Sequence, residues 1–543
     1  MAFKSKSRIY IEQLSRENKD KNISDRGLAK LALENRPDLF NDFEHARTFV
    51  RDVHGKRGAE KRARKRDTDL IKEKNPVYKE PEPPQQYKYA AKRKLNKTAK
   101  RFIITYAQNN TPVHKEFLKN IEAYAAYIKA DIHVILGRYR NPTSVFTDSS
   151  EEYWDESIVK YADANRHNIH KHLTLLSDIK VQPTAKMPLT GLESISGNTS
   201  SIFGHPKVSM TTIAALEGYL PKMLFTTGAC TLPNYTDSKA GKQGEFHHTF
   251  GFITVEVKDS EVFYVRQVTA LKDGSFTDLF FNVKTGQISQ VESIEAAILG
   301  DTHVGEHCPL VNKSQRSLLN RLKPKHTIIH DVFNGHSISH HDEKDPIVQF
   351  NRHKDGTNSL EREIQEMINW IDTMKKYNLV FVASNHSDWI DRYIKSNDWK
   401  KNIHNAMTYI SAASILLSGK AQKGLIGFYI KESFGKQVIV LGRNDSFKVK
   451  GWEIAQHGDI STNGSRGSIA GFGKLSTKMV VGHSHTPSRT SGLLYVGTST
   501  KLRVEYNVGA SSWMNSDVII HRDGKAQHII YVGKNKEFTT IKF

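Results

Sequence analysis

The chain has 543 residues, of which 38% are hydrophobic, and it carries a net charge of +21 with a pI near 9.5. This length exceeds what one hydrophobic core serves, so two to four domains are expected. No apolar run approaches the roughly 18 residues that cross a membrane, the N-terminus lacks the apolar core of a signal peptide, and Cys230 and Cys308 are the only cysteines. The composition therefore excludes a membrane protein and a disulfide framework, and it favours a cytoplasmic protein with a polyanionic partner.

Residues 1–75 are expected to form a basic helical module. Ser24 and Asp25 precede an apolar repeat that stops before Pro37, and a second apolar repeat begins at Phe43. Short helices broken by a turn are typical of a helix-turn-helix, but a helical cap or an oligomerisation element explains the pattern equally well. A homo-oligomer is therefore an open expectation.

A basic run between residues 56 and 74, expected to be helical, is densest at Lys61, Arg62, Arg64, Lys65 and Arg66. Residues 1–100 contain 27 Lys and Arg against 15 Asp and Glu, so more than half of the net charge lies in less than a fifth of the chain. Charge runs are usually solvated faces, but a run this dense binds nucleic-acid backbone through counterion release. We predict that these five residues contact nucleic acid. Residues 76–100, rich in Pro and Lys, are expected to form a linker.

Residues 101–290 are expected to form a central α/β domain. A βαβ unit is predicted from Phe102–Tyr106, Val113–Ile128 and Ile132–Leu136. An antiparallel sheet is predicted from Phe252–Val257, Val262–Val268 and Thr277–Val283. No glycine-rich phosphate loop follows the first strand, so no nucleotide site is expected there.

Residues 291–543 contain five polar blocks, each of which follows an apolar, β-prone run. In chain order they are Ala296–His303, Thr327–Asn334, Leu379–Asp388, Trp452–Asp459 and Met479–Pro487. Ligand sites of open α/β sheets form outside the carboxyl ends of the strands, so five such ends can bring their side chains together. The blocks supply seven candidate metal ligands: Asp301, His303, Asp331, Asn385, His457, His483 and His485.

These ligand types predict two divalent metal ions. Carboxylate, amide and imidazole groups without thiolates suit Mn²⁺, Fe or Zn²⁺, and seven ligands exceed the needs of one tetrahedral ion. We expect Mn²⁺ in preference to Fe, Zn²⁺ or Mg²⁺. Two ions ~3.5–4 Å apart clamp the attacking and leaving oxygens of a phosphoryl displacement, so phosphoester cleavage is the expected chemistry.

Further elements are predicted around these blocks. Asn358 and Glu361 predict the start of an amphipathic helix between the second and third blocks. Short strands are predicted after the last block, at Gly492–Tyr495, Asp517–His521 and His528–Val532.

The order of the motifs resembles the calcineurin-like metallophosphoesterase superfamily, whose pattern is DxH, GDxxD, GNH, an isolated His and GHxH. The resemblance covers about residues 290–500 and implies a β-sandwich flanked by helices. It implies a first metal held by Asp301, His303 and His485, a second metal held by Asn385, His457 and His483, and a bridge between them formed by Asp331. It further implies that His386 is the acid that protonates the leaving oxygen.

The chain departs from this pattern in three places. His330 and Ser384 stand where the family has Gly, and Asn334 stands where it has a second acid. An amide cannot stabilise an imidazolium as a carboxylate does, so the resemblance leaves the pKa of His386 open. Asp388 is the candidate substitute for the missing acid.

Together these features predict a two-metal phosphodiesterase that degrades DNA, with hydroxide attack on phosphorus and His386 as the general acid. The order of a basic helical N-terminus, an α/β domain and a metal domain is similar to that of the early host-DNA-degrading nucleases of some tailed phages, which implies the host cytoplasm. Two alternatives stay open: a phosphomonoesterase acting on proteins or nucleotides, and a non-catalytic DNA-binding regulator. The regulator is weakened because every metal-ligand position is filled.

Overall fold

The computed structural model describes residues 5–21, 23–54, 84–141, 152–342, 345–475, 477–504 and 507–541. The chain divides into two compact units, Met1–Pro83 and Pro84–Phe543, and each is described by itself. The five basic residues expected to contact nucleic acid, Lys61, Arg62, Arg64, Lys65 and Arg66, lie outside the described residues, as does the helix expected around them.

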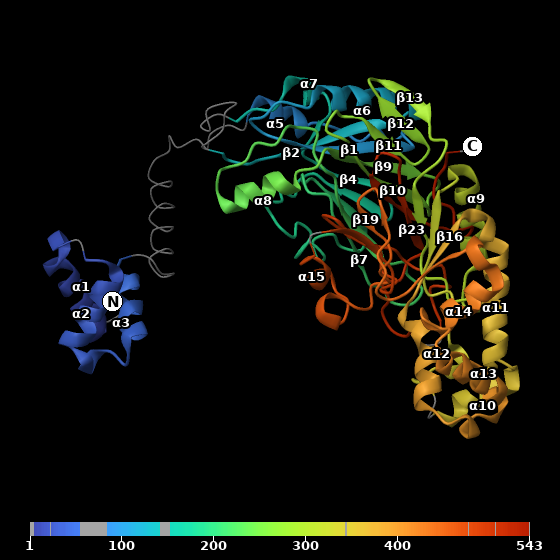
Figure 1. The fold of residues 1–543 in the computed structure, drawn as a ribbon. Helices are drawn as coiled ribbons and strands as arrows, with labels where there is room; N and C mark the ends of the chain where they lie inside the picture. Colours follow the sequence, from blue (N-terminus) through green and yellow to red (C-terminus); the bar gives the residue numbers. More distant parts are fainter. Residues whose placement is uncertain are drawn as a thin grey trace. The chain divides into compact units, whose positions relative to one another are not determined.

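Three α-helices form the described part of the first unit: α1 (Lys6–Glu17), α2 (Asp25–Asn35) and α3 (Phe43–Val53) (Figure 1). The Ser24 side chain accepts a hydrogen bond from the Gly27 N–H, so α2 begins where predicted. Leu28, Ala29 and Ala32 are the buried residues of α2, and they pack with the apolar faces of the other two helices. Helices this short depend on such packing because they are marginal in isolation.

A five-stranded sheet in the second unit has the order β10-β9-β1-β2-β3. Its strands are β1 (Arg101–Gln108), β2 (Asp131–Gly137), β3 (Ala162–Asp163), β9 (Gly251–Val257) and β10 (Phe263–Thr269). β1 and β2 are parallel and are joined by α6 (Lys115–Ile128), which confirms the predicted βαβ unit. β9 and β10 are antiparallel, as predicted. Residues 84–100, expected to be linker, pack here: α5 (Gln85–Ala90) precedes Arg93, whose guanidinium lies 3.0 Å from Asp131.

The strand expected over Thr277–Val283 is divided in the structure. β11 (Phe276–Asp278) and β12 (Phe281–Lys284) pair as antiparallel neighbours, and β13 (Gln287–Gln290) extends them. The chain reverses at Leu279, which adopts a left-handed φ of 51°. The prediction of one strand was wrong because this turn lacks the Gly or Pro that usually marks a reversal.

A six-stranded sheet has the order β17-β16-β15-β14-β23-β24. Its four parallel strands are β14 (Ala296–Ile298), β15 (His326–Ile329), β16 (Leu379–Val382) and β17 (Ile439–Leu441). β23 (Ser516–Ile520) and β24 (Ala526–Ile530) continue the sheet in antiparallel fashion, close to where two C-terminal strands were predicted. The connections contain α9 (Pro309–Leu322), α11 (Leu360–Met374), α12 (Asn385–Ser396) and α14 (Gly424–Phe434).

A ten-stranded sheet has the order β18-β19-β20-β22-β21-β7-β8-β6-β5-β4. One half contains β18 (Lys448–Val449), β19 (Trp452–Glu453), β20 (Lys478–Val481), β21 (Ser488–Thr490) and β22 (Leu493–Tyr495). The other half contains β4 (Arg166–His170), β5 (Leu173–Leu176), β6 (Ser200–Phe203), β7 (Met210–Ile213) and β8 (Lys222–Thr226). The halves meet where Arg489 lies opposite Met210. Segments from both sides of the domain boundary expected at residue 290 therefore share this sheet.

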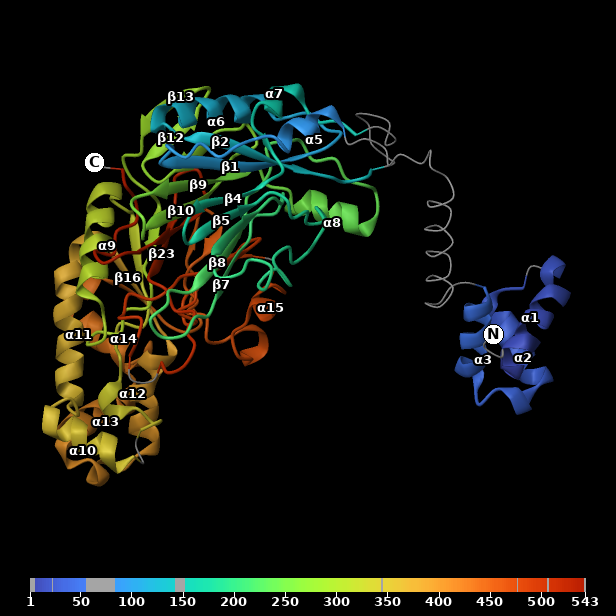
Figure 2. The ribbon, with the colours of Figure 1, turned by 180° about the vertical axis from the view of Figure 1, so that it is seen from behind.

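An apolar core lies between the six-stranded and ten-stranded sheets. Ile298, Ile328 and Val380 of the first sheet pack with Val480 and Leu494 of the second. The other face of the six-stranded sheet belongs to a separate core that includes buried residues of α9, α11, α12 and α14. Figures 1 and 2 show α9 and α11 on the outer side, beside β16. The fold is therefore mixed α/β, as predicted, with two sheets face to face.

The helix predicted from Asn358 and Glu361 is α11, and it begins one residue later than expected. Ser359 caps it by accepting a hydrogen bond from the Arg362 N–H. The remaining helices include α7 (Glu156–Val159), α8 (Lys239–His247), α10 (Pro346–Asp355), α13 (Ala406–Leu417) and α15 (Ile469–Phe472). Over the described ranges, no helix is long and apolar enough to cross a bilayer.

Candidate metal centre

Strand ends from two facing sheets bring the candidate ligands together. β14, β15 and β16 are parallel neighbours, so their carboxyl ends lie at the same edge of the six-stranded sheet. β19 and β20 are parallel neighbours in the ten-stranded sheet. The first set of ends leads into Asp301, His303, Asp331 and Asn385, and the second leads into His457, His483 and His485.

Four of these seven residues have a backbone conformation that non-glycine residues rarely adopt. The φ angles are 43° at His303, 43° at Asp331, 72° at His483 and 54° at His485. Such strain costs on the order of 1–3 kcal/mol per residue and gathers at functional sites. Gly482 allows the chain before His483 to pass close to Asp301, because a Cβ at position 482 would lie only 2.3 Å from Asp301 Oδ1.

The first group of ligand atoms belongs to Asp301, His303, Asp331 and His485, which are buried and lie within 4.8 Å of one another. His485 Nε2 lies 3.1 Å from Asp301 Oδ2 and 3.2 Å from His303 Nε2. His303 Nε2 lies 3.6 Å from Asp331 Oδ2. Two imidazoles and two carboxylates that share so small a volume form a donor set suited to a divalent transition metal.

A second group consists of Asp301, His330 and His457, whose ligand atoms also lie within 4.8 Å of one another. His457 Nε2 lies 3.1 Å from Asp331 Oδ2 but does not have the geometry of a hydrogen bond. Asp331 Oδ2 therefore has His457 from one group and His303 from the other within 4 Å. This is the position that a carboxylate would have to occupy in order to bridge two metal ions.

Asn385 and His483 are the two remaining candidate ligands. Asn385 Oδ1 is buried and has no hydrogen-bond partner among the described residues. The His483 ring centroid lies 5.3 Å from that of His457, and the main-chain N–H of His483 donates to Asp301 Oδ2 over 2.6 Å. The His483 side chain is thus near His457 of the second group, and Asn385 is the first residue of α12.

Several buried polar atoms of the centre have no partner. In the described part of the chain these are Asp301 Oδ1, Asp331 Oδ1, Asn385 Oδ1, His485 Nδ1 and both ring nitrogens of His330 and His457. Each unsatisfied buried group costs about 1–3 kcal/mol, so a concentration of them indicates a bound species that satisfies oxygen and nitrogen lone pairs together. The residues present therefore fit divalent metal ions.

Burial and charge shift the pKa values of these groups in opposite directions. Burial by itself would raise the pKa of Asp301, but His457 and His485 lower it to about 2. Burial by itself would lower the pKa of His457, but Asp331 and Asp301 raise it to about 9. Burial lowers the pKa of His303 to about 3 and that of His330 to about 4. His303 and His330 are therefore neutral at pH 7, as metal-binding imidazoles must be.

His386 lies beside the first group and is held by two contacts. Its Nδ1 donates to the main-chain oxygen of Asn334 over 2.6 Å, and its ring stacks on Trp389 with centroids 4.0 Å apart. The His386 and His303 ring centroids are 4.5 Å apart. Burial lowers the pKa of His386, although Asp331 and the Asn334 carbonyl oppose this shift. The main-chain carbonyl of Asn334 is thus the hydrogen-bond partner of His386, in place of the acid that is missing from this chain.

Asp388 contacts a different residue. Its Oδ2 lies 3.3 Å from Arg443 Nε, and Arg443 also forms an ion pair with Asp459. Burial raises the pKa of Asp388, and Arg443 opposes that shift. Residues two apart on a helix do not face each other, so the position of Asp388 on α12 suits the orientation of Arg443 better than that of His386.

Sequence reasoning missed three contributors to the centre. His330 was noted only as a departure from a glycine, although its place directly before Asp331 was a usable signal. Asn334 orients two histidines, because its Oδ1 lies 3.2 Å from His303 Nδ1 while its main-chain oxygen accepts from His386. Trp389 was not singled out, and its spacing of three residues from His386 on a helix was the available signal.

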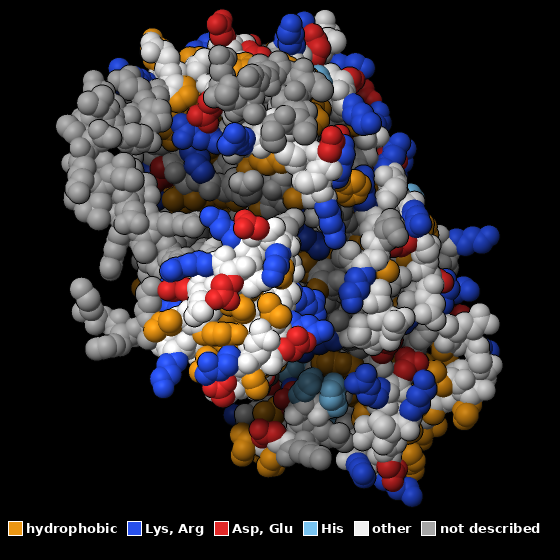
Figure 3. Space-filling model, turned by 90° about the vertical axis from the view of Figure 1, so that its left-hand side faces the viewer, with side chains coloured by type: hydrophobic (Ala, Val, Ile, Leu, Met, Phe, Trp, Pro, Cys, Tyr) orange, Lys and Arg blue, Asp and Glu red, His pale blue; other side chains and the backbone are white. Residues whose placement is uncertain are grey.

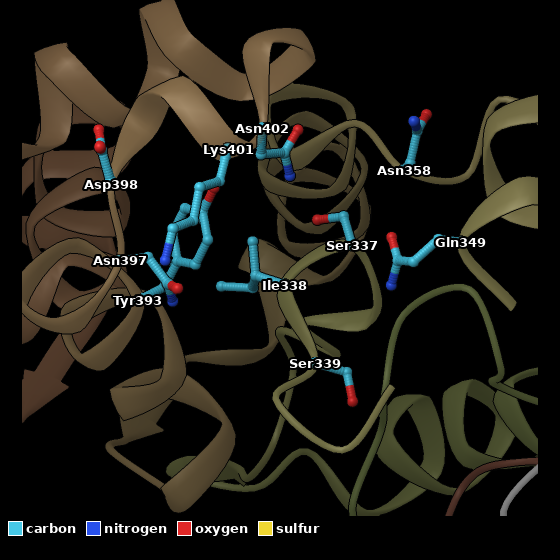
Figure 4. A pocket seen from close by; sticks show the side chains of 10 residues that line it. All are labelled: Ser337, Ile338, Ser339, Gln349, Asn358, Tyr393, Asn397, Asp398, Lys401 and Asn402. Atoms are coloured by element: carbon cyan, nitrogen blue, oxygen red, sulfur yellow. The ribbon is translucent and has the colours of Figure 1, made fainter. Parts of the chain in front are cut away.

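Two further polar features hold none of the candidate ligands. A cavity of about 310 Å³ next to Ser337 and Ile338 is lined largely by polar side chains (Figure 4). At the edge of the five-stranded sheet, His133 of β2 and Asp163 of β3 form another compact His–Asp group with His167 of β4. There both ring nitrogens of His133 bond to carboxylates, so this group is a satisfied structural network.

Comparison with known proteins gives one relative. The chain is 29% identical over 470 residues to Protein A1 of Escherichia phage T5, an alignment that covers 81% of this chain and 83% of that protein. No protein-family model matches the chain, and no solved structure matches it. The chain is therefore similar to a phage protein over most of its length, while its resemblance to metallophosphoesterases rests on the sequence motifs and is not supported by these comparisons.

Proposed function

We propose that the protein is a two-metal phosphodiesterase that degrades DNA. The observation that carries this proposal is the convergence of six buried ligand-type side chains from two sheets, with unpartnered oxygen and nitrogen atoms among them; they are Asp301, His303, His330, Asp331, His457 and His485. One ion would be held by Asp301, His303 and His485, the other by Asn385, His457 and His483, with Asp331 shared. When bound, such ions supply Lewis acidity and an activated water for attack on phosphorus.

The residues of the chain supply the proton for the leaving oxygen. His386 is half-buried beside His303, and its Nδ1 is committed to the Asn334 carbonyl, so Nε2 is the nitrogen that exchanges a proton. Trp389 fixes the plane of the ring by stacking. In this proposal His386 protonates the departing oxygen, and Asn334 and Trp389 are positioning residues.

Charge and similarity support DNA as the substrate. The net charge of +21 favours a polyanion, and a similarity that spans four fifths of a phage protein is compatible with a nuclease that acts in the host cytoplasm. A phosphomonoesterase would use the same metal ligands, and a non-catalytic regulator would carry the same positive charge. The substrate comparison below separates these two alternatives from the nuclease.

The test is hydrolysis by the purified protein with Mn²⁺ of plasmid DNA, of RNA, of bis(p-nitrophenyl) phosphate as a diester and of p-nitrophenyl phosphate as a monoester. We expect cleavage of DNA and of the diester, loss of both on chelation, and recovery with Mn²⁺. Asp331→Ala is the control variant and should be inactive because both ions lose a ligand. Preferred cleavage of the monoester would establish the phosphomonoesterase, and DNA binding without any cleavage would establish the regulator.

A further inference from the structure

An exposed aromatic rim borders His386. His340 and His341 are exposed in the turn after the 3₁₀ helix His336–Ile338. Their ring centroids lie 4.0 Å apart, and they lie 5.2 and 5.9 Å from the ring of Trp389. Trp389 stacks in turn on His386, so four rings run without a break from the proton donor to the surface.

The turn that carries these histidines is held firmly. Glu363 of α11 accepts hydrogen bonds from the main-chain N–H groups of His336 and Ser337 and from the Ser337 hydroxyl. Asp342 forms an ion pair of 2.6 Å with Arg352 at the other end of the turn. Two exposed aromatic side chains on an anchored turn lose little conformational entropy on binding, which favours a recognition surface.

The rim combines planar rings with positive charge. Arg392, exposed one turn beyond Trp389 on α12, lies close enough to lower the pKa of His340. Burial contributes most to that shift and His341 adds to it, so His340 is a neutral ring at pH 7. Histidine side chains gather on the face of the molecule drawn in Figure 3, with Lys and Arg side chains around them. Planar rings beside a cation suit stacking on a base whose phosphates are held nearby.

We infer that His340, His341 and Trp389 form a stacking site for a nucleobase next to the scissile phosphate. This inference rests on the proposed function, because it assumes that a nucleic-acid strand enters the metal centre past His386. It adds a recognition element that a small phosphodiester cannot use. The rim would therefore make the enzyme prefer polynucleotides over simple esters. Stacking on the rim would require a base that is unstacked or single-stranded.

The binding test uses the full chain, chelator to stop turnover, and about 0.3 M salt to weaken backbone electrostatics. Fluorescence anisotropy compares a labelled oligothymidylate with an abasic strand of the same length, for wild type and for the His340→Ala/His341→Ala double variant. We expect the double variant to lose about tenfold in affinity for the base-bearing strand and nothing for the abasic strand. His353→Ala/His404→Ala, which removes two other exposed histidines of the second unit, is the matched control.

The inference is overturned if the affinity ratio of base-bearing to abasic strand is the same in wild type and the double variant. A second readout is turnover with Mn²⁺, where KM for the oligonucleotide should rise about tenfold at unchanged kcat while bis(p-nitrophenyl) phosphate hydrolysis stays within about twofold. Trp389→Phe, which keeps a ring, should retain base discrimination, whereas Trp389→Ala should lose it. A wild-type protein that cleaves neither substrate would refute the proposed function, while the affinity ratio would still decide whether the rim binds bases.

Discussion

At the scale of single residues, hydrogen bonds decide which nitrogen each histidine presents to the centre. The Asn334 side chain engages His303 Nδ1, which leaves His303 Nε2 in the ligand group, 3.2 Å from His485 Nε2. The Asn334 main chain does the same for His386. Such outer contacts tune ligand basicity and fix orientation. An amide in place of the expected acid therefore keeps the geometry of the site but removes a negative charge from it.

We expect His386→Asn to separate chemistry from metal binding. The variant should retain both ions, measured by elemental analysis, while kcat on DNA falls about 10²–10⁴-fold, the usual size of general-acid catalysis. The loss should be much smaller on a nitrophenyl ester, whose leaving group hardly needs a proton. Because burial lowers the pKa of His386, the acid form is lost as pH rises through a value below 6.5, and this limb of the DNA pH–rate profile should vanish in the variant. Equal losses on both substrates, or lost metal, would assign His386 a structural or ligand role.

We expect His330→Ala to weaken metal binding. The ring of His330 is buried beside Asp301 and His457 with both nitrogens unpartnered, so it is placed to act as a ligand or to orient one. Calorimetric titration with Mn²⁺ should show a loss of about 10–100-fold in affinity for one of two sites. His326→Ala, at the start of the strand that His330 directly follows and only partly buried, is the control. Two sites of wild-type affinity in the His330 variant would contradict the prediction.

At the scale of elements, a buried charge network joins β2 to β3 and β4. His133 Nδ1 lies 2.6 Å from Asp163 and its Nε2 lies 3.0 Å from Asp131, while His167 lies 2.8 Å from Asp163. Burial opposes charge on His133, but the two carboxylates raise its pKa. The same contacts lower the pKa of Asp163 to about 2 against the effect of burial. The network thus stabilises a sheet edge that has only two residues of β3 to hold it.

The stability of the fold should therefore depend on pH through His133. A raised folded-state pKa means that its contribution is fully present below about pH 6.5 and is lost as pH rises through the folded value. The Asp163 contribution, about 2 kcal/mol, is present above about pH 4 and is lost as pH falls toward 2. Melting curves should show that wild-type Tm falls between pH 6 and 9 more steeply than that of His133→Gln. Parallel curves for the two proteins would show that His133 is not charged in the folded state.

At the scale of the whole molecule, the positive charge is divided between the two units. Residues 1–83 contain 21 Lys and Arg against 15 Asp and Glu, a net charge of +6, so most of the +21 belongs to the second unit. Lys92, Lys94, Lys97 and Lys100 are exposed on that unit. DNA affinity should therefore be shared by the units, and a truncation should end at Pro83, because residues 84–100 pack against the five-stranded sheet.

Removal of residues 1–83 should reduce DNA affinity and the slope of its salt dependence without abolishing either. Hydrolysis of bis(p-nitrophenyl) phosphate should be unchanged, because no candidate ligand is removed. A full-length variant with Lys61, Arg62, Arg64, Lys65 and Arg66 changed to Ala tests the basic run in the intact chain. If that variant binds DNA with wild-type affinity and salt slope, the basic run is a solvated face and not a binding segment.

The sequence by itself determined the local features of this protein. Apolar runs that end in polar blocks predicted the strands β14, β15, β16 and β20 and the residues at their ends, because hydrophobic pattern and turn chemistry act over a few residues. Ser24 marked the start of α2 for the same reason, since a cap bonds within its own turn. The mixed α/β class followed from the order of such elements.

Only the tertiary structure decided what lies across from each of these residues. His330 became a candidate ligand because the ten-stranded sheet places His457 opposite it. Asp388 forms an ion pair with Arg443, which lies 55 residues further along the chain. The shared sheet of residues 166–226 and 448–495 likewise arises from pairing between distant segments. Periodicity in a sequence shows which side chains share a face, but the partner of that face is set by long-range packing, which carries no local signal.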